Sequence, residues 1–161
     1  MRLPSTLAGL ALLIAWSAAA QFTPPPAPTH WVTDTAAFIT EKTRRSLDAR
    51  LQKYERDTGH QVIVWIGRTT GGHVLEDWAT RTFNAWGIGR KQYNDGVALF
   101  VFSEDRKLRI EVGLGLEKVL TNAVAARILS EVAVPRLKAG DRDGAIAATV
   151  DALLKSLDRK K

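Results

Sequence analysis

Cysteine is absent from the 161 residues, and this absence excludes several kinds of chemistry. Without thiols the chain has no disulfide bonds, no cysteine metal site and no cysteine nucleophile. The domain therefore depends on side-chain packing for its stability. Long apolar runs are also scarce. Only residues 7–15 approach one, and they fall short of the roughly 20 residues that span a bilayer.

The N-terminus has the features of a secretory signal peptide. Arg2 precedes the apolar run, and small residues follow it, with Ala18 and Ala20 in an A-x-A cleavage pattern. We therefore expect residues 1–20 to be removed near Ala20, which leaves a soluble periplasmic or secreted chain without a transmembrane anchor. An uncleaved membrane anchor is the alternative, and the short apolar run disfavours it.

The rest of the chain has the composition of one ordinary domain. A Pro-rich linker, residues 21–30, precedes a domain at residues 31–158, and a short basic tail follows at residues 159–161. The net charge is only +6, and no cluster of Lys and Arg is dense enough to predict nucleic-acid binding.

Apolar patterns predict the fold class. Residues 61–66 and 97–102 are apolar on both faces, which is typical of strands covered from both sides. Residues 107–112 alternate between polar and apolar, which indicates a half-exposed antiparallel strand. Helical spacing of apolar residues is present in residues 40–56, 74–86, 122–132 and 141–157. The order predicts an α/β fold, a three-layer α/β/α sandwich with a small, mostly parallel sheet and an antiparallel edge strand.

Gly113 and Gly115 follow the third predicted strand and raise the possibility of a phosphate-binding loop. A dinucleotide fingerprint has a third glycine and a helix that begins directly after a parallel strand. Here Leu116 and Glu117 follow, and the preceding strand is antiparallel. We therefore expect a turn that presents backbone carbonyl groups, and no nucleotide site.

Six segments carry a resemblance to a known family. They are "VTD" at residues 32–34, "ERDTGHQ" at 55–61, "WGIG" at 86–89, "NDGVALFVF" at 94–102, "RKLRIEVGLGLE" at 106–117 and "AGDRDGAI" at 139–146. Together they resemble the TPM-domain family, which includes thylakoid-lumen proteins of photosystem II repair and many exported bacterial proteins. The resemblance implies the same fold and two activities, namely binding of a divalent cation, usually calcium, and weak acid phosphatase activity.

The resemblance also implies a role in the assembly or repair of membrane complexes. Three positions depart from the family pattern: Leu114 and Arg142 replace tyrosines, and Asn122 replaces an aspartate. The last change removes one charge from any acidic site that includes it. Many bacterial relatives also have a C-terminal membrane helix, which this sequence lacks.

Carboxylates are expected at two opposite edges of the sheet. Asp34 falls with other acids near the carboxyl ends of the parallel strands, where open α/β sheets bind ligands. Asp95 and Glu117 fall at the other edge, with most of the family-like segments and the glycine-rich turn. Because Ca²⁺ prefers carboxylate and carbonyl oxygens, we predict Asp95 and Glu117 as metal ligands, with Asp34 as a further candidate. The structural alternatives are turn formation beside Gly96 for Asp95, a solvated position at a helix start for Glu117, and a cap or Asx-turn for Asp34.

A phosphatase would also need cations that hold the phosphoryl group. Arg106 and Arg109 are the candidates for phosphate binding, although Arg109 alternatively pairs with Glu111 on the same strand face. The three histidines fit no zinc motif and are expected to be solvated, and no catalytic residue is identified.

The sequence thus predicts an exported accessory factor that binds a metal ion, such as Ca²⁺ or another divalent cation, or a partner. An envelope or membrane protein complex is the expected partner, and a process such as membrane-complex assembly or repair is the expected context. A metal-assisted acid phosphatase that acts on phosphate esters is the alternative.

Overall fold

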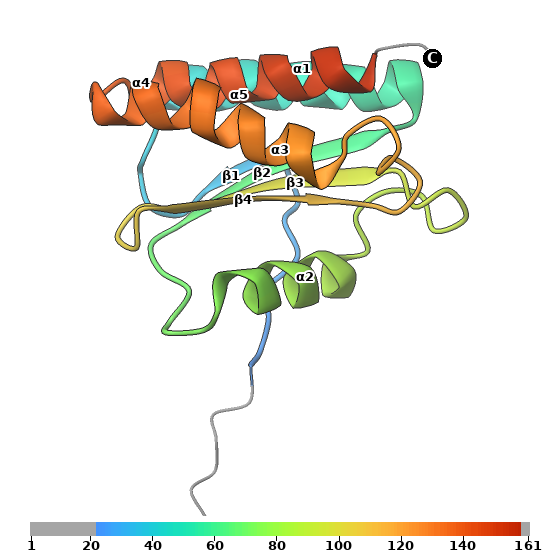
Figure 1. The fold of residues 1–161 in the computed structure, drawn as a ribbon, viewed down its shortest axis with the longest axis horizontal. Helices are drawn as coiled ribbons and strands as arrows, with labels where there is room; N and C mark the ends of the chain where they lie inside the picture. Colours follow the sequence, from blue (N-terminus) through green and yellow to red (C-terminus); the bar gives the residue numbers. More distant parts are fainter. Residues whose placement is uncertain (1–21, 159–161) are drawn as a thin grey trace, which may run out of the picture.

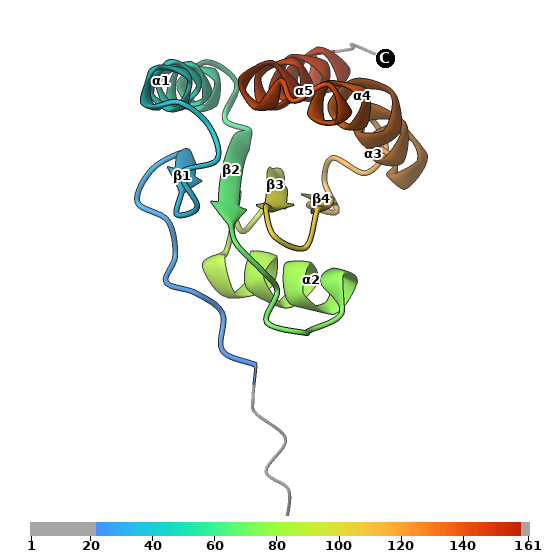
Figure 2. The ribbon, with the colours of Figure 1, turned by 90° about the vertical axis from the view of Figure 1, so that its left-hand side faces the viewer.

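The computed structural model describes residues 22–158 and places one four-stranded sheet between two layers of helices (Figures 1 and 2). The strands are β1 (Val32–Asp34), β2 (Gln61–Gly67), β3 (Gly96–Phe102) and β4 (Lys107–Val112). The helices are α1 (Glu41–Thr58), α2 (Leu75–Trp86), α3 (Asn122–Ile128), the π-helical turn η1 (Leu129–Ala133), α4 (Val134–Lys138) and α5 (Arg142–Leu157). The predicted signal peptide and basic tail lie outside the described residues.

The sheet has the spatial order β1-β2-β3-β4, with the first three strands parallel and β4 antiparallel to β3. The predicted α/β/α sandwich with an antiparallel edge strand is therefore confirmed. The short strand β1 was not predicted. It extends the sheet by pairing Val32 with Val64, and its three residues are too few to show a periodic pattern.

The larger core lies between the sheet and the layer that contains α1, α3 and α5 (Figure 2). Thr40 begins α1 by accepting a hydrogen bond from the Thr43 amide, and Gly59 ends it in the left-handed conformation, with φ of 80°. Asp141 begins α5 in the same way, through the Gly144 amide at 2.8 Å. These caps fix the two long helices that cover β2 and β3.

The other face of the sheet is covered by α2 and is rich in aromatic side chains (Figure 2). Trp78 of α2 packs edge-on against Phe102, with ring centroids 4.8 Å apart. The predicted linker contributes to this layer, because Phe22 contacts Trp78 and the Trp86 indole donates a hydrogen bond to Pro25 O at 2.8 Å. The segment is extended, as its prolines predict, but it packs on the domain.

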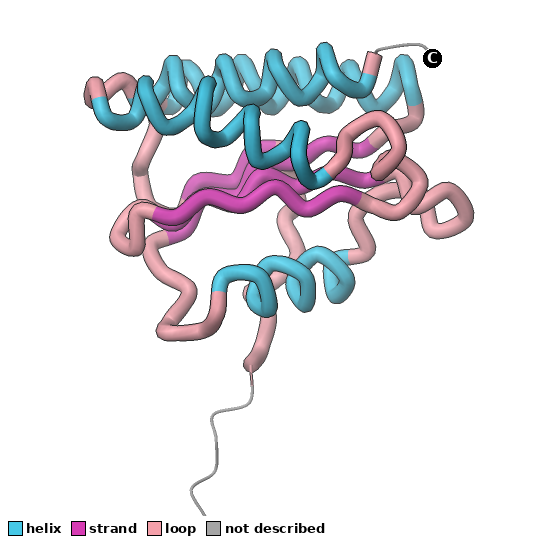
Figure 3. Tube along the Cα trace, in the orientation of Figure 1, coloured by secondary structure: helices cyan, strands magenta, loops and turns pink. Residues whose placement is uncertain are grey.

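The predicted helix at residues 122–132 is wrong in its end point. The helical path continues through η1 and α4 to Lys138, and the tube in Figure 3 shows this path as one bent rod. The change of helix type falls directly before Pro135, which has no N–H to donate to a helical hydrogen bond.

No helix in residues 22–158 is both long enough and apolar enough to cross a membrane.

Strand β4 has one paired edge and one open edge. The Gly113 amide donates to Gly96 O at 2.8 Å, and the register continues from Val112 opposite Val97. Since bonded and non-bonded pairs alternate in an antiparallel ladder, Arg109 and Glu111 bond to β3. The backbone groups of Leu108 and Ile110 point outward, and no described strand pairs with them.

This alternation predicts a pattern of amide hydrogen exchange along β4. The amides of Arg109 and Glu111 should exchange at least roughly 100-fold more slowly than those of Leu108 and Ile110, because only the former are bonded within the sheet. Residue-resolved exchange measured by NMR tests this expectation. Equal protection of all four amides would contradict an open edge.

Candidate functional site

Asp95 is the one charged side chain in residues 22–158 that is fully buried, with 2% of its surface exposed. Its Oδ1 accepts a hydrogen bond from the Arg90 amide at 2.8 Å, and its Oδ2 accepts one from Arg90 Nε at 2.8 Å and another from Nη2. His60 Nδ1 lies 3.3 Å from the same Oδ2. Asp95 is therefore held by one arginine and one histidine.

A tight loop before β3 produces this arrangement. The amides of Tyr93 and Asn94 both donate to Arg90 O, and Asn94 adopts φ of 49°, a left-handed conformation that asparagine tolerates. The Arg90 guanidinium lies over the Tyr93 ring, 4.2 Å from its centroid. The loop turns back on itself and brings Arg90 and Asp95 together.

The pKa of the Asp95 carboxyl is below its ordinary value. Burial alone would raise that pKa, but the hydrogen bonds from the side chain and amide of Arg90, and the contact with His60, outweigh burial. The same pair raises the pKa of the Arg90 guanidinium, since the carboxylate stabilises its charge. Asp95 is thus an ionised carboxylate whose charge is balanced within the loop.

Glycines at this edge of the sheet allow backbones to touch. A Cβ atom at Gly96 would lie 2.3 Å from Ile88 O, and one at Gly115 would lie 1.9 Å from Tyr93 O. Both distances are far below a normal van der Waals contact, so only glycine fits. Gly115 also donates its amide hydrogen to Asn94 O at 3.0 Å. The turn after β4 therefore rests on the loop before β3.

The structure brings the turns of Asp95 and Glu117 to the same edge of the sheet but turns the two side chains to different surroundings. Asp95 points to Arg90 and His60 inside the loop. Glu117 is exposed on the turn after β4. Asn122 begins α3 after this turn and is also exposed.

Asp34, the third predicted ligand, caps the loop that leads from β1 to α1. Its Oδ1 accepts from the Ala36 amide at 3.0 Å, and its Oδ2 accepts from the amides of Phe38 and Ile39 at 2.8 and 3.0 Å. This is the capping alternative that the sequence left open.

The strand register places Asp34 and Asp95 at opposite edges of the sheet. Asp34 pairs with Ile66, which pairs with Val101, six positions beyond Asp95. Six residues of strand correspond to roughly 20 Å. Within residues 22–158, no three His, Asp or Glu side chains are grouped to hold one metal ion. The predicted ligands therefore do not form a ready-made calcium site.

The two arginines predicted to bind phosphate lie in different surroundings. Arg109 donates from Nε to Glu111 Oε1 at 2.8 Å, as the alternative interpretation proposed, and Glu111 also accepts from Thr80 on α2. Arg106 lies in the turn between β3 and β4, where it adopts φ of 54° and is exposed. The structure does not bring them together on one phosphate.

Sequence reasoning missed the residues that hold Asp95. The Asn94-Asp95-Gly96 stretch signals a turn, but no spacing rule indicates that Arg90, five residues earlier, returns to Asp95. His60 was expected to be solvated, and the structure instead places its ring nitrogen beside the carboxylate. Gln61 was also missed, and its Oε1 accepts from the Gly89 amide at 2.7 Å.

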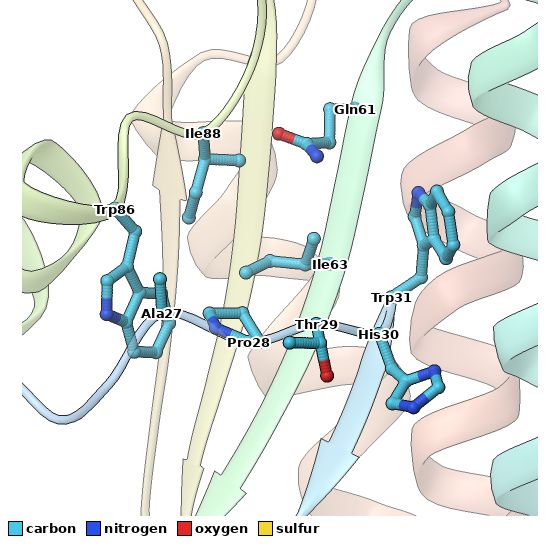
Figure 4. Close-up of a pocket in the computed structure, with 9 residues that line it drawn as sticks. All are labelled: Ala27, Pro28, Thr29, His30, Trp31, Gln61, Ile63, Trp86 and Ile88. Carbon is cyan, nitrogen blue, oxygen red and sulfur yellow. The ribbon is translucent and has the colours of Figure 1, made fainter.

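A small cavity lies beside this edge, between the N-terminal segment and the sheet (Figure 4). Its walls include Ala27, Pro28, Gln61, Trp86 and Ile88, and its volume is about 190 Å³. Pockets that enclose organic ligands usually measure about 300–1,000 Å³. The cavity is therefore too small to enclose an ordinary cofactor.

Known proteins similar to the chain share its fold. The family model described as TPM domain matches residues 32–156. The N-terminal domain of a P. gingivalis protein is 26% identical, with a TM-score of 0.74 over 81% of this chain and 83% of that chain. The N-terminal domain of the cg2496 protein from Corynebacterium glutamicum is 17% identical, with a TM-score of 0.62 over 88% of this chain and 90% of that chain.

A third similar structure is the BA42 protein from the psychrophilic bacterium Bizionia argentinensis. It is 16% identical, with a TM-score of 0.65 over 77% of this chain and 84% of that chain. At this identity the likeness concerns the fold alone. Among curated proteins there is no match.

The Asp95 contacts predict the stability of an Asp95→Asn variant. Asparagine keeps one acceptor oxygen but loses the charge, so the free energy of unfolding should fall by about 1–3 kcal/mol at pH 7. Urea denaturation measures this change. Asp57→Asn, which removes an exposed carboxylate paired with Lys53 on α1, is the matched control and should leave the midpoint unchanged.

The stability of wild type and of Asp95→Asn should also differ in its dependence on pH. Because the pKa of Asp95 is lower in the folded chain than in the unfolded chain, its stabilisation is complete above about pH 4 and is lost as the pH falls through the folded-state pKa. The stability difference between wild type and Asp95→Asn should therefore shrink below pH 4. A difference that stays constant down to pH 2 would show that ionisation of Asp95 is not involved.

Proposed function

We propose, from the premise that the chain belongs to the TPM-domain family, that it is an exported accessory domain that binds a partner protein of the cell envelope. The proposed partner contributes an extended segment, which adds to the sheet as a strand beside β4. Assembly or repair of an envelope or membrane protein complex is the process that such binding serves. In this proposal the domain works by binding, and catalysis is not required.

The open edge of β4 is the observation that supports the proposal. It lies in a groove of about 370 Å³ between α2 and α3. The walls are formed by Leu75 and Glu76 of α2, by Leu108, Arg109 and Ile110 of β4, and by Asn122, Ala125, Ala126 and Leu129 of α3 and η1. Figure 2 shows β4 at the end of the sheet, with α3 on one side and α2 on the other.

Strand addition suits the chemistry of this groove. The outward backbone groups of Leu108 and Ile110 are donors and acceptors that another extended chain can pair with. Apolar walls on the α3 side can receive alternate side chains of the added strand, and Glu76 and Arg109 supply charge on the α2 side. The groove thus offers both regular main-chain bonds and sequence selectivity.

The charged residues of β4 limit self-association. Lys107, Arg109 and Glu111 occupy alternate positions of the strand, and such charges discourage pairing between two copies of the same edge. Arg109 and Glu111 already form an ion pair, so an added strand need not leave either charge unbalanced. The edge is therefore selective and not generally adhesive.

Binding of a divalent cation is the alternative to binding of a partner, and it stays a prediction. Asp95 is the most buried candidate ligand, but Arg90 already balances its charge and occupies both of its oxygens. A calcium ion at Asp95 would have to displace this guanidinium. The metal-assisted phosphatase alternative has the same requirement, and its two candidate phosphate ligands, Arg106 and Arg109, are apart.

Calcium titration by calorimetry tests whether the domain binds a metal ion. We expect wild type to bind Ca²⁺ no more tightly than about 1 mM, the weak end of protein calcium sites, because Arg90 competes for Asp95. Arg90→Gln should strengthen binding, since it releases the carboxylate. A tighter wild-type site that is lost in both Asp95→Asn and Glu117→Gln would instead establish the calcium site.

Hydrolysis of p-nitrophenyl phosphate that survives purification and is lost in Asp95→Asn and Arg106→Gln would favour the phosphatase.

The groove is tested with peptides selected from a random display library on the wild-type protein. Ala126→Arg fills the groove from the exposed face of α3 and should abolish binding of the selected peptides. Ala123→Arg places the same side chain on the same helix outside the groove and should leave binding intact. Bound peptide should also slow exchange of the Leu108 and Ile110 amides. Binding that neither variant changes, with no slowing at these two amides, would overturn strand addition.

A further inference from the structure

A second, larger groove lies at the carboxyl ends of the parallel strands, and four basic side chains surround it. Its volume is about 590 Å³. Arg106 comes from the turn between β3 and β4, Lys107 begins β4, Lys138 ends α4, and Arg142 begins α5. Figure 1 shows this turn and the α4–α5 connection at the same end of the molecule. No Asp or Glu lines the groove.

The four cations have no carboxylate partner among the described residues. None of them forms an ion pair within residues 22–158. The nearby acids are engaged elsewhere: Asp105 accepts from the Thr70 amide at 2.8 Å, and Asp143 accepts from the Thr40 amide at 2.9 Å. These bonds hold the pKa of both carboxyls below the ordinary value. Both carboxyls stay ionised and lie next in sequence to Arg106 and Arg142, but neither forms an ion pair with a cation of the groove, so the four cations are free to pair with a ligand.

The interior of the groove is apolar. Its walls include Phe38, Val101, Leu108, Val134 and Leu137. Val134 and Leu137 are only half-buried and belong to neither core cluster of the described residues. Apolar side chains that the core does not use, next to unpaired cations, form an amphipathic site.

Arg142 links the charged rim to the apolar wall. Its guanidinium carbon lies 4.9 Å from the centroid of the Phe38 ring, a cation–π contact between two residues that line the groove. A guanidinium in this position can donate two parallel hydrogen bonds to a phosphate or carboxylate. Arg106, on the turn between β3 and β4, also lines the groove.

The position agrees with the general rule for open α/β sheets, whose ligands bind outside the carboxyl ends of the strands. The volume lies within the range of about 300–1,000 Å³ found for organic ligands. We infer that this groove binds a small anionic amphiphile, that is, a phosphate or carboxylate group attached to an aliphatic or aromatic body. The anionic group lies between Arg106 and Arg142, and the apolar body lies against Val134 and Leu137.

This inference is independent of strand addition at β4, although Leu108 borders both grooves. Octyl phosphate, used below its micelle concentration, and inorganic phosphate are the probes for a calorimetric titration of the purified protein. Octyl phosphate should bind at least about tenfold more tightly than inorganic phosphate, because the chain adds buried apolar area. Arg142→Gln and Arg106→Gln should each weaken both ligands by about tenfold or more.

Two matched variants separate the parts of the site. Leu137→Asn should weaken octyl phosphate and leave inorganic phosphate unchanged. Arg56→Gln removes the same charge from an exposed position on α1, away from the groove, and should change neither affinity. If Arg56→Gln and Arg142→Gln weaken binding equally, the attraction is general electrostatics and the inference is overturned. The inference is also overturned if octyl phosphate binds no more tightly than inorganic phosphate.

The same chemistry can come from a lipid headgroup or from a free phosphate ester. Flotation with vesicles of phosphatidylglycerol and phosphatidylcholine distinguishes these sources. Co-flotation that requires phosphatidylglycerol and is lost in the Arg106→Gln/Arg142→Gln double variant indicates a lipid. Titration with octyl phosphate without flotation indicates a free ligand. Absence of both overturns the inference.

Discussion

The ion pair between Asp95 and Arg90 is the contact on which this edge of the domain depends. It closes the loop before β3, and the loop in turn supports the turn after β4 through the amide of Gly115. Glycine at that position is a steric requirement of the same contact, because the Tyr93 carbonyl occupies the space of a Cβ atom. A buried charge is costly unless it is paired, so the loop conformation and the ion pair stabilise each other. The family-like segments around Asp95 and Gly113 therefore have a structural explanation that needs no ligand.

Most of the fold could be predicted from the sequence because the burial of its strands and helices follows the pattern of apolar residues. Strand β4 alternates, β2 and β3 are apolar on both faces, and the caps Thr40 and Asp141 mark helix starts. For the candidate site, the sequence could predict only which edge of the sheet holds Asp95 and Glu117. Which carboxylates are free depends on loop conformation, and the left-handed turn at Asn94 that returns Arg90 to Asp95 has no periodic signature. The linker was misjudged for a similar reason, since composition predicts its extended form but not the packing of Phe22 on Trp78.

The general rule for ligand sites in α/β sheets favours the carboxyl ends of the strands, whereas the family-like segments lie mostly at the opposite edge. The two edges differ in how their charged side chains are paired. At the Asp95 edge, charge is balanced inside the loop. At the carboxyl ends of the strands Asp34 and Asp105 accept hydrogen bonds from backbone amides, while four cations of the groove have no carboxylate partner in residues 22–158. Cations without an ion-pair partner next to apolar side chains outside the core are the stronger indication of a ligand, because the same molecule can contact both.

The two grooves meet at the first residues of β4, and this geometry has a consequence for how ligands interact. Leu108 borders both grooves, and its outward backbone groups are among those that an added strand would pair with. An anion held between Arg106 and Arg142 would lie near the end of such a strand, where its charge would attract a basic residue of the incoming segment and repel an acidic one. Under the two proposals together, occupation of the cationic groove would change which segments bind along β4. Selectivity of this kind requires no movement of the sheet, since the electrostatic interaction acts directly across a shared border.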